Sequence, residues 1–133
     1  MSKEFLQIAG NNANGVITTC QYNPKGDNPI YKKFREDYIK RFNMEPDVFA
    51  VHAYDAANIL LDAIRQAGLN RVKIRDLLLD LKTYQNYQGA SGTIVFDATW
   101  TDVGQIYMAE IKNNDFIFTP YQYKGNPLRS SIK

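Results

Sequence analysis

The stretch EPDVFAVHAYDAANILLDAIRQAG, residues 45–68, constrains the fold more than any other part of the sequence, because it predicts one long helix. Pro46 and Asp47 are typical of a helix start, since proline tolerates the first turn and an acidic side chain accepts from free backbone amides. Gly68 is the expected left-handed terminator. Between these limits apolar residues cover most of the circumference, so we expect this helix to be buried on several sides.

The chain has the size and composition of one soluble globular domain, with 133 residues of which 44% are hydrophobic and 23% are charged. Its net charge of +2, with acidic and basic residues interleaved, gives no reason to expect a nucleic-acid partner. A single cysteine, Cys20, excludes an internal disulfide and a thiolate metal cluster. The start MSKEFLQIAG lacks the features of a secretory signal peptide, and no apolar run reaches membrane-spanning length, so the chain as written would stay in the cytosol.

The rest of the sequence alternates between helical and β patterns. Residues 16–22 are rich in β-branched side chains and bounded by turn residues, which predicts a strand. From Pro29 to Phe42 apolar residues recur at helical spacing, which predicts an amphipathic surface helix. The other expected elements are the end of a short helix at 4–9, a helix at 72–81, a polar loop at 82–92, strands at 92–97, 105–112 and 115–121, a tight turn at Asn113-Asn114, and a tail at 122–133.

This order of elements is unusual for a self-sufficient domain. The early strand needs parallel partners that the chain does not obviously provide. The helices would also have to cover a sheet that offers only a hairpin and one more strand.

Motifs for catalysis are absent from the sequence, which has no phosphate-binding glycine loop, HExxH, CxxC or GxSxG. His52 and Asp55 lie three residues apart on one helix face, an arrangement that can orient an imidazole as a general base. Because no nucleophile is placed beside them, we favour a histidine satisfied by a neighbour and a solvated or capping aspartate. We expect no enzymatic activity, no metal site and no cofactor. The other polar candidates are interpreted as core, turn or surface residues: Cys20, Asp97, Asp102 and Glu110.

Aromatic residues are the second candidate signal, because aromatic walls with a few polar groups line many small-molecule sites. Phe49, His52 and Tyr54 stand in the first two turns of the long helix, where free backbone amides and the positive end of the helix dipole face whatever lies beyond. These three are therefore candidate binding residues. The others are assigned to packing or to a surface loop: Tyr31, Phe34, Tyr38, Phe42, Tyr84 and Tyr87.

Four blocks follow one another from about Phe5 to Phe118: IAGNNANGVITTCQYNP, FREDYIKRFNMEPDVFAVHAYDAANILLDAI, YQGASGTIVFD and GQIYMAEIKNNDF. In this order and spacing they resemble the C-terminal third of the leucine/isoleucine/valine-type periplasmic binding proteins, the type I solute-binding subunits of ABC importers. The resemblance implies an α/β chain with part of the type I periplasmic-binding-protein fold. In that fold, two lobes joined by three crossing segments enclose a small solute.

The resemblance also divides the chain between the two lobes. Residues 1–22 and about 92–121 resemble parts of one lobe, about 24–90 resemble the helical part of the other, and 122–133 form a tail. The chain would cross near Tyr22 and return near GTIVFD. The parallel strands at the centre of each lobe are not expected in this chain, which accounts for the unusual order of elements.

In this family the start of the long helix borders the solute cleft, and an aromatic residue placed like Phe49 packs on the solute's apolar side chain. Phe49 is therefore the first candidate ligand-binding residue, with core packing as an open alternative. His52 and Tyr54 are weaker candidates, and for Tyr54 packing against a sheet competes. Tyr22 and Asn23, at the crossing, are weaker still. The groups that hold the solute's carboxylate and ammonium would precede Met1, so the chain alone is expected to bind an amino acid poorly.

We interpret the chain as the C-terminal portion of a protein that captures an amino acid or similar small solute between two lobes and presents it to an ABC permease. Two alternatives stay open: a ligand-sensing receptor or regulatory domain of the same fold, and a small independent enzyme. The parent is expected in the periplasm or anchored to a membrane outside the cytoplasm. For the isolated chain, unpaired strand edges and the apolar helix predict self-association, for example as a strand-exchanged dimer.

Overall fold

The computed structural model of the protein describes residues 3–80 and 86–121. The predicted tail at 122–133 and the loop tyrosine Tyr84 lie outside the described residues. In the described part, no helix combines the length and the hydropathy that crossing a membrane requires. The elements in chain order are α1 (Lys3–Ala9), the 3-10 helix η1 (Gly10–Ala13), β1 (Ile17–Cys20), α2 (Pro29–Phe42), α3 (Val48–Ala67), α4 (Arg71–Leu79), β2 (Tyr87–Gln88), β3 (Thr93–Ile94), β4 (Tyr107–Lys112) and β5 (Asp115–Pro120).

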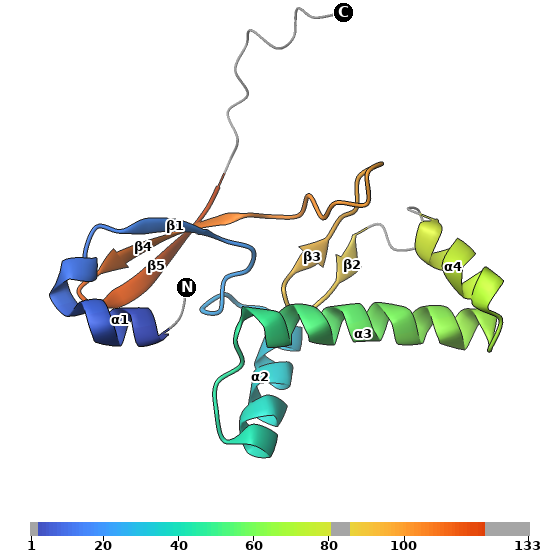
Figure 1. The fold of residues 1–133 in the computed structure, drawn as a ribbon, viewed down its shortest axis with the longest axis horizontal. Helices are drawn as coiled ribbons and strands as arrows, with labels where there is room; N and C mark the ends of the chain where they lie inside the picture. Colours follow the sequence, from blue (N-terminus) through green and yellow to red (C-terminus); the bar gives the residue numbers. More distant parts are fainter. Residues whose placement is uncertain (1–2, 81–85, 122–133) are drawn as a thin grey trace, which may run out of the picture.

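The elements form two groups that lie side by side (Figure 1). The sheet group consists of α1, η1, β1, β4 and β5, and the helical group consists of α2, α3, α4, β2 and β3. The chain passes between the groups twice, through residues 21–28 and residues 95–106. The expected α/β class, with pieces of two lobes, is therefore confirmed.

The three-stranded sheet has the order β1-β4-β5, and both pairs of neighbours are antiparallel. β1 pairs with β4 from Ile17 opposite Glu110 to Cys20 opposite Tyr107. The sequence indicated no antiparallel partner for the early strand, but within the described residues the C-terminal part of the same chain supplies one. In the described part of the chain, β1 and β5 are the outer strands of this sheet.

The turn between β4 and β5 is formed by Asn113 and Asn114, as the sequence predicts. Both residues have positive φ, 51° and 60°, the combination of a type I′ turn, whose twist matches that of the flanking strands. The backbone of the fully buried Ile111 bonds to Gly15 and Val16, which ties the loop after η1 to the sheet.

The helix α2 begins and ends at the predicted residues. The side chain of Asn28 caps it, since Oδ1 accepts from the amides of Ile30 at 2.9 Å and Tyr31 at 3.2 Å. Asn43 ends the helix with φ 52°, in the left-handed region that asparagine tolerates. The apolar stripe of α2 packs against α3 in one core cluster: Tyr22, Tyr31, Phe34, Val51 and Ala90.

The long helix α3 also has the predicted limits. The Asp47 carboxylate accepts from the Ala50 amide at 2.8 Å, and Gly68 follows the last turn with φ 64°. Only one line of side chains is buried, at four-residue spacing: Val51, Asp55, Ile59 and Ala63. The expectation of burial on several sides is therefore wrong for the described chain. The open face of α3 consists of exposed apolar residues on the other side of the helix: Phe49, Ala53, Ala56, Ala57, Leu60 and Leu61.

The short β2–β3 hairpin is not among the predicted elements. β2 falls within the predicted polar loop, and β3 covers only two residues of the strand predicted at 92–97. Beyond β3 the pairing continues as a single bridge between Phe96 and Asp102. Ile94 packs with Ile59 and Ala63 of α3, so the hairpin and α4 lie along the buried side of that helix.

Candidate functional site

Phe49 lies at the second position of α3 and is 79% exposed. Burying a phenylalanine side chain is worth about 1.5–3 kcal/mol relative to leaving it in water, so covering this ring would be favourable. Of the two interpretations left open for Phe49, packing in the core does not hold within the described chain.

Tyr22 and His52 are brought together by the fold. Their ring centroids lie 6.3 Å apart in an edge-to-face arrangement, and Tyr22 is only 7% exposed. Burial raises the pKa of the Tyr22 hydroxyl well above its usual range, and the neighbouring Tyr31 and Cys20 add to the effect. The Nε2 atom of His52 is buried, and among the described residues it has no hydrogen-bond partner. A buried polar atom in this state favours any group that can complete its hydrogen bond.

Tyr54 and Asn23 lie apart from this pair. The Tyr54 ring packs on Phe34 of α2, with centroids 4.6 Å apart, so it serves the contact between the two helices. The Asn23 Oδ1 atom accepts from the backbone amide of Lys25 at 2.9 Å. Asn23 also lines a shallow hollow of about 290 Å³ beside Phe116 of β5. Of the five predicted binding residues, the structure therefore joins Tyr22 and His52, with Phe49 one helical turn before His52.

Asp55 is not the solvated or capping residue that we favoured, because it is 2% exposed. Its Oδ1 accepts from the Ala90 amide at 2.6 Å, and its Oδ2 accepts from the amide and the hydroxyl of Ser91 at 2.8 and 2.6 Å. Asn28 holds the same turn by donating to the carbonyls of Gly89 at 2.9 Å and Ala90 at 3.1 Å. The carboxylate thus fixes the tip of the β2–β3 hairpin and is not engaged with the imidazole of His52.

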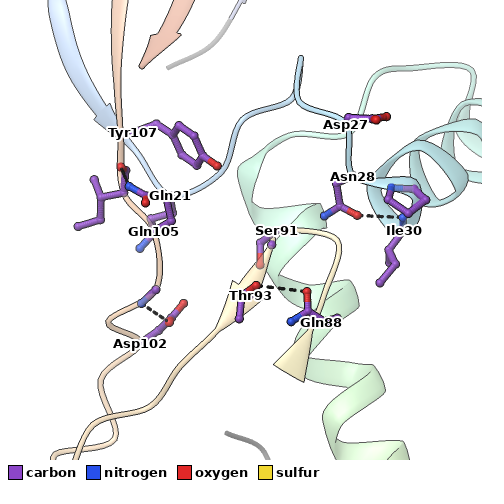
Figure 2. Close-up of a pocket in the computed structure, with 14 residues that line it drawn as sticks. Gln21, Asp27, Asn28, Ile30, Gln88, Ser91, Thr93, Asp102, Gln105 and Tyr107 are labelled. Atoms are coloured by element: carbon purple, nitrogen blue, oxygen red, sulfur yellow. Dashed lines mark hydrogen bonds between the residues drawn. The ribbon is translucent and has the colours of Figure 1, made fainter. Parts of the chain in front are cut away.

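A crevice of about 510 Å³ separates the two groups of elements, and none of the five predicted residues lines it. Figure 2 shows Gln21, Gln105 and Tyr107 on the sheet-group side and Asn28, Gln88 and Ser91 on the helical-group side. The sequence offered only a weak signal for it, namely two polar, glycine-containing loops at the ends of predicted elements. Its full lining is Gln21, Asp27, Asn28, Pro29, Ile30, Gln88, Ser91, Gly92, Thr93, Asp102, Gly104, Gln105, Ile106 and Tyr107.

Two carboxylates reach the crevice. Asp27 forms an exposed ion pair with Lys32, whose hydrogen bond lowers the pKa of the aspartate. Asp102 forms no ion pair with any residue that the structure describes. Its Oδ1 accepts from the amides of Gly104 at 2.9 Å and Val95 at 3.1 Å.

No metal centre is formed by residues 3–80 and 86–121, since no three His, Cys, Asp or Glu side chains are close enough to share an ion. Cys20 is free, and its thiol donates to the Tyr22 carbonyl at 3.0 Å.

Solved structures with this arrangement are substrate-binding proteins. The leucine-binding protein LivK from Thermotoga maritima matches with a TM-score of 0.72 and 33% identity, over 89% of this chain and 33% of its own. The branched-chain amino acid substrate-binding protein LivJ from Streptococcus pneumoniae, solved with isoleucine, matches with a TM-score of 0.72 and 25% identity, over 90% of this chain and 35% of its own. A solute-binding protein from R. palustris, solved with benzoate, shares the fold with a TM-score of 0.70 and 23% identity, over 86% of this chain and 32% of its own.

The fold is thus that of one class of protein, the substrate-binding proteins of ABC transporters. The sequence profile described as periplasmic binding protein matches residues 2–115. The chain belongs to the periplasmic binding protein family, and it spans about a third of the length of the neighbours above. Among curated proteins none matches the chain significantly.

Proposed function

We propose that this chain is the C-terminal portion of an extracytoplasmic solute-binding protein that captures an amino acid or similar small solute between two lobes and delivers it to an ABC permease. The observation that carries the proposal is the open face of α3, in a chain that covers only a third of each neighbour. Catalysis plays no part in this function.

The open face of α3 is suited to lie against a sheet. This face runs along a helix of 20 residues, about 30 Å long, and it carries no charged side chain. Ala53, Ala56 and Ala57 permit close approach, while Leu60 and Leu61 offer side chains of 44% and 47% exposure for burial. Contiguous apolar surface of this kind marks an interaction site. In the proposed parent, β-structure encoded outside this chain covers it.

The solute would meet the chain at the start of this face. Phe49 would pack on the apolar part of the solute, and the unpartnered Nε2 of His52 would hydrogen-bond a polar group. Tyr22 and Asn23 would border the solute from the crossing segment. Tyr54, already packed on Phe34, would contribute least. Leucine or isoleucine, as named for the two amino-acid-binding neighbours, is the favoured solute class, and an aromatic acid is the second.

Closure of two lobes requires a point at which the crossing segments bend. Lys25 is tied to the sheet group, since its Nζ bonds to the Asp115 carboxylate at 2.6 Å and the Phe116 carbonyl at 2.8 Å. Asn28 is tied to the helical group through the carbonyls of Gly89 and Ala90. Only Gly26 and Asp27 separate the two anchors, so we infer that the first crossing bends there.

The isolated chain would also self-associate. Its sheet offers two outer strands, β1 and β5, whose edges can pair with another copy, and the open face of α3 can be shared between copies. Analytical ultracentrifugation at micromolar concentration would give a dimer or larger species. A sharply defined monomer over the same range would speak against this part of the proposal.

Calorimetric titration with leucine tests the binding function. Leucine is titrated into this chain, into the N-terminal portion of the Thermotoga neighbour, and into an equimolar mixture of the two. The proposal predicts strong heat only for the mixture, and about tenfold weaker affinity with Phe49→Ala, because an apolar contact of this size is worth roughly 1.5–3 kcal/mol. Leu69→Ala, at a residue that is 95% exposed beyond the end of α3, serves as the control. Equal binding by this chain alone would overturn the proposal.

A further inference from the structure

We propose that the crevice between the sheet group and the helical group is a second binding site, which takes a small organic ammonium compound with its charged group at Asp102. The site differs from the proposed solute site, since Phe49, His52, Tyr54, Tyr22 and Asn23 do not line it. Its test uses this chain alone and does not depend on the solute-binding proposal.

The crevice has two walls from different parts of the fold. Gln21 follows β1, and Gln105, Ile106 and Tyr107 lead into β4, so they form the wall of the sheet group. Figure 2 shows Tyr107 extending from β4 toward the helical group. The opposite wall is the start of α2 and the β2–β3 hairpin. A molecule in the crevice therefore contacts both groups at once.

The helical-group wall is held in place before any ligand arrives. Asp55 fixes the hairpin tip through Ala90 and Ser91, and Asn28 fixes it through two backbone carbonyls. Gln88 is held as well, since its Oε1 accepts from the Thr93 hydroxyl at 3.2 Å and its Nε2 donates to the Asn86 carbonyl at 3.0 Å. A wall fixed in this way loses little conformational entropy on binding.

The sheet-group wall carries polar groups that are free to bind. Among hydrogen bonds between described residues, none involves the side-chain amide of Gln21 or the hydroxyl of Tyr107. Both can donate to and accept from a ligand. Pro29, Ile30 and Ile106 add apolar surface to the same lining, so the crevice suits a ligand with an apolar body and a polar end.

Charge decides which polar end fits. The residues that line the crevice in the described chain include two aspartates and no lysine, arginine or histidine. Asp27 is already paired with Lys32, whereas Asp102 has no cationic partner among the described residues. Two backbone amides orient Asp102 through its Oδ1, which leaves Oδ2 for a donor from a ligand. An ammonium group is favoured, and the carboxylate of a free amino acid would find no cation here.

Titration followed by ¹H–¹⁵N NMR tests the proposal, with three probes of the same carbon skeleton: n-butylammonium, butan-1-ol and butanoate. n-Butylammonium should shift the signals of the Gln21 and Gln105 side-chain amides and of the Thr93 backbone amide saturably at millimolar concentration. Butan-1-ol should bind about tenfold more weakly, since a hydrogen bond to a charged group is worth about 1.5–3 kcal/mol. Butanoate should cause no saturable shift.

Asp102→Asn keeps the Oδ1 acceptor and removes the charge, so it should weaken n-butylammonium binding about tenfold and leave butan-1-ol unchanged. Glu36→Gln removes a charge from the exposed side of α2 and should change the affinity for neither n-butylammonium nor butan-1-ol. Tyr107→Phe, which removes only a hydroxyl, should weaken the binding of n-butylammonium severalfold. This variant tests the proposal if Asp102→Asn fails to fold. Equal shifts with butanoate, or identical affinities in both crevice variants and the unmodified chain, would overturn the proposal.

Discussion

Asp55, in the middle of α3, accepts two hydrogen bonds from Ser91, at the tip of the β2–β3 hairpin and 36 positions later in the chain. A third bond, from the Ala90 amide, satisfies the other carboxylate oxygen. This one side chain connects the longest helix to the loop that lines the crevice. Because the carboxylate is almost completely buried, its loss leaves donors without acceptors.

Replacing Asp55 with alanine should therefore destabilise the chain by about 3 kcal/mol, since two buried amides and a hydroxyl lose their acceptor. Ser91→Ala should cost only about 1 kcal/mol, because the Ser91 amide bond remains. Chemical denaturation followed by circular dichroism measures both. Asp62→Ala, on an exposed part of the same helix, is the control and should change stability by less than about 0.5 kcal/mol. Equal effects at positions 55 and 62 would refute the role given to Asp55.

Gly89 lies so close to Asp55 that a β-carbon on it would come within 2.6 Å of the carboxylate. Gly89→Ala should destabilise the chain by about 2 kcal/mol, because the hairpin tip must move away from its acceptor. Gly26→Ala, where the nearest atom would be 3.2 Å away, should cost less than about 1 kcal/mol.

Combining Gly89→Ala with Asp55→Ala provides an internal check. The clash disappears with the carboxylate, so the double variant should be more stable than the sum of the single effects implies. Strict additivity in a double-mutant cycle would show that the two residues do not act through this contact.

Tyr22 should give the chain a characteristic sensitivity to alkaline pH. Burial raises its pKa above the ordinary value of 10.0, so the folded chain keeps a proton that the unfolded chain loses. The contribution of Tyr22 to the free energy of unfolding is thus constant below pH 10. It falls as the pH rises above 10, by at most about 1.4 kcal/mol per pH unit.

Denaturation curves between pH 9 and pH 11.5 measure this dependence. Tyr22→Phe should make it shallower, and the remaining slope comes from Tyr31, whose pKa burial also raises. Tyr121→Phe is a suitable control, since the Tyr121 side chain is 45% exposed. A Tyr22→Phe variant that keeps the full alkaline slope would show that another group is responsible.

Phe49 and Val51 lie two residues apart on α3, and the larger of the two side chains is the exposed one. Phe49 is 79% exposed, whereas Val51 is completely buried between α2 and the hairpin. Phe49→Ala should therefore change the free energy of unfolding by less than about 0.5 kcal/mol, while Val51→Ala should reduce it by about 2 kcal/mol. A large loss of stability with Phe49→Ala would mean that the ring is packed within the chain and is not available to a solute.

The limits of the helices could be predicted from the sequence because they depend on local chemistry. Asn28 and Asp47 accept hydrogen bonds from backbone amides of the first turns of their helices, as their residue types suggest. Gly68 ends α3 at the predicted place with a positive φ of 64°, but its ψ of −157° lies outside the left-handed helical region that we expected. The turn at Asn113-Asn114 follows from the same local logic.

The partner of β1 and the β2–β3 hairpin could not be predicted, since both depend on groups far away in the sequence. Pattern alone does not say that residues 17–20 find an antiparallel partner at 107–110. It also does not say that Asp55 and Asn28 hold the tip of a hairpin within a predicted polar loop.

The candidate site was predicted only in part. The aromatic pattern indicated Phe49, His52 and Tyr54, and the family resemblance added Tyr22 and Asn23. The structure brings Tyr22 to His52 but turns Tyr54 toward Phe34. An apolar pattern around a helix does not tell which side its own chain covers, so the open face of α3 required the structure. The crevice was missed because its lining comes from six separate stretches of the chain.

The central claim is that the open face of α3 is made to pack on β-structure from outside this chain. Hydrogen–deuterium exchange of the chain with and without the N-terminal portion of the Thermotoga neighbour tests it most directly, with Leu60→Glu as the variant that should prevent the contact. We predict that the amides of residues 53–61 become strongly protected in the mixture and that Leu60→Glu abolishes this protection. Unchanged exchange across α3 in a mixture shown to contain both folded chains would contradict the account.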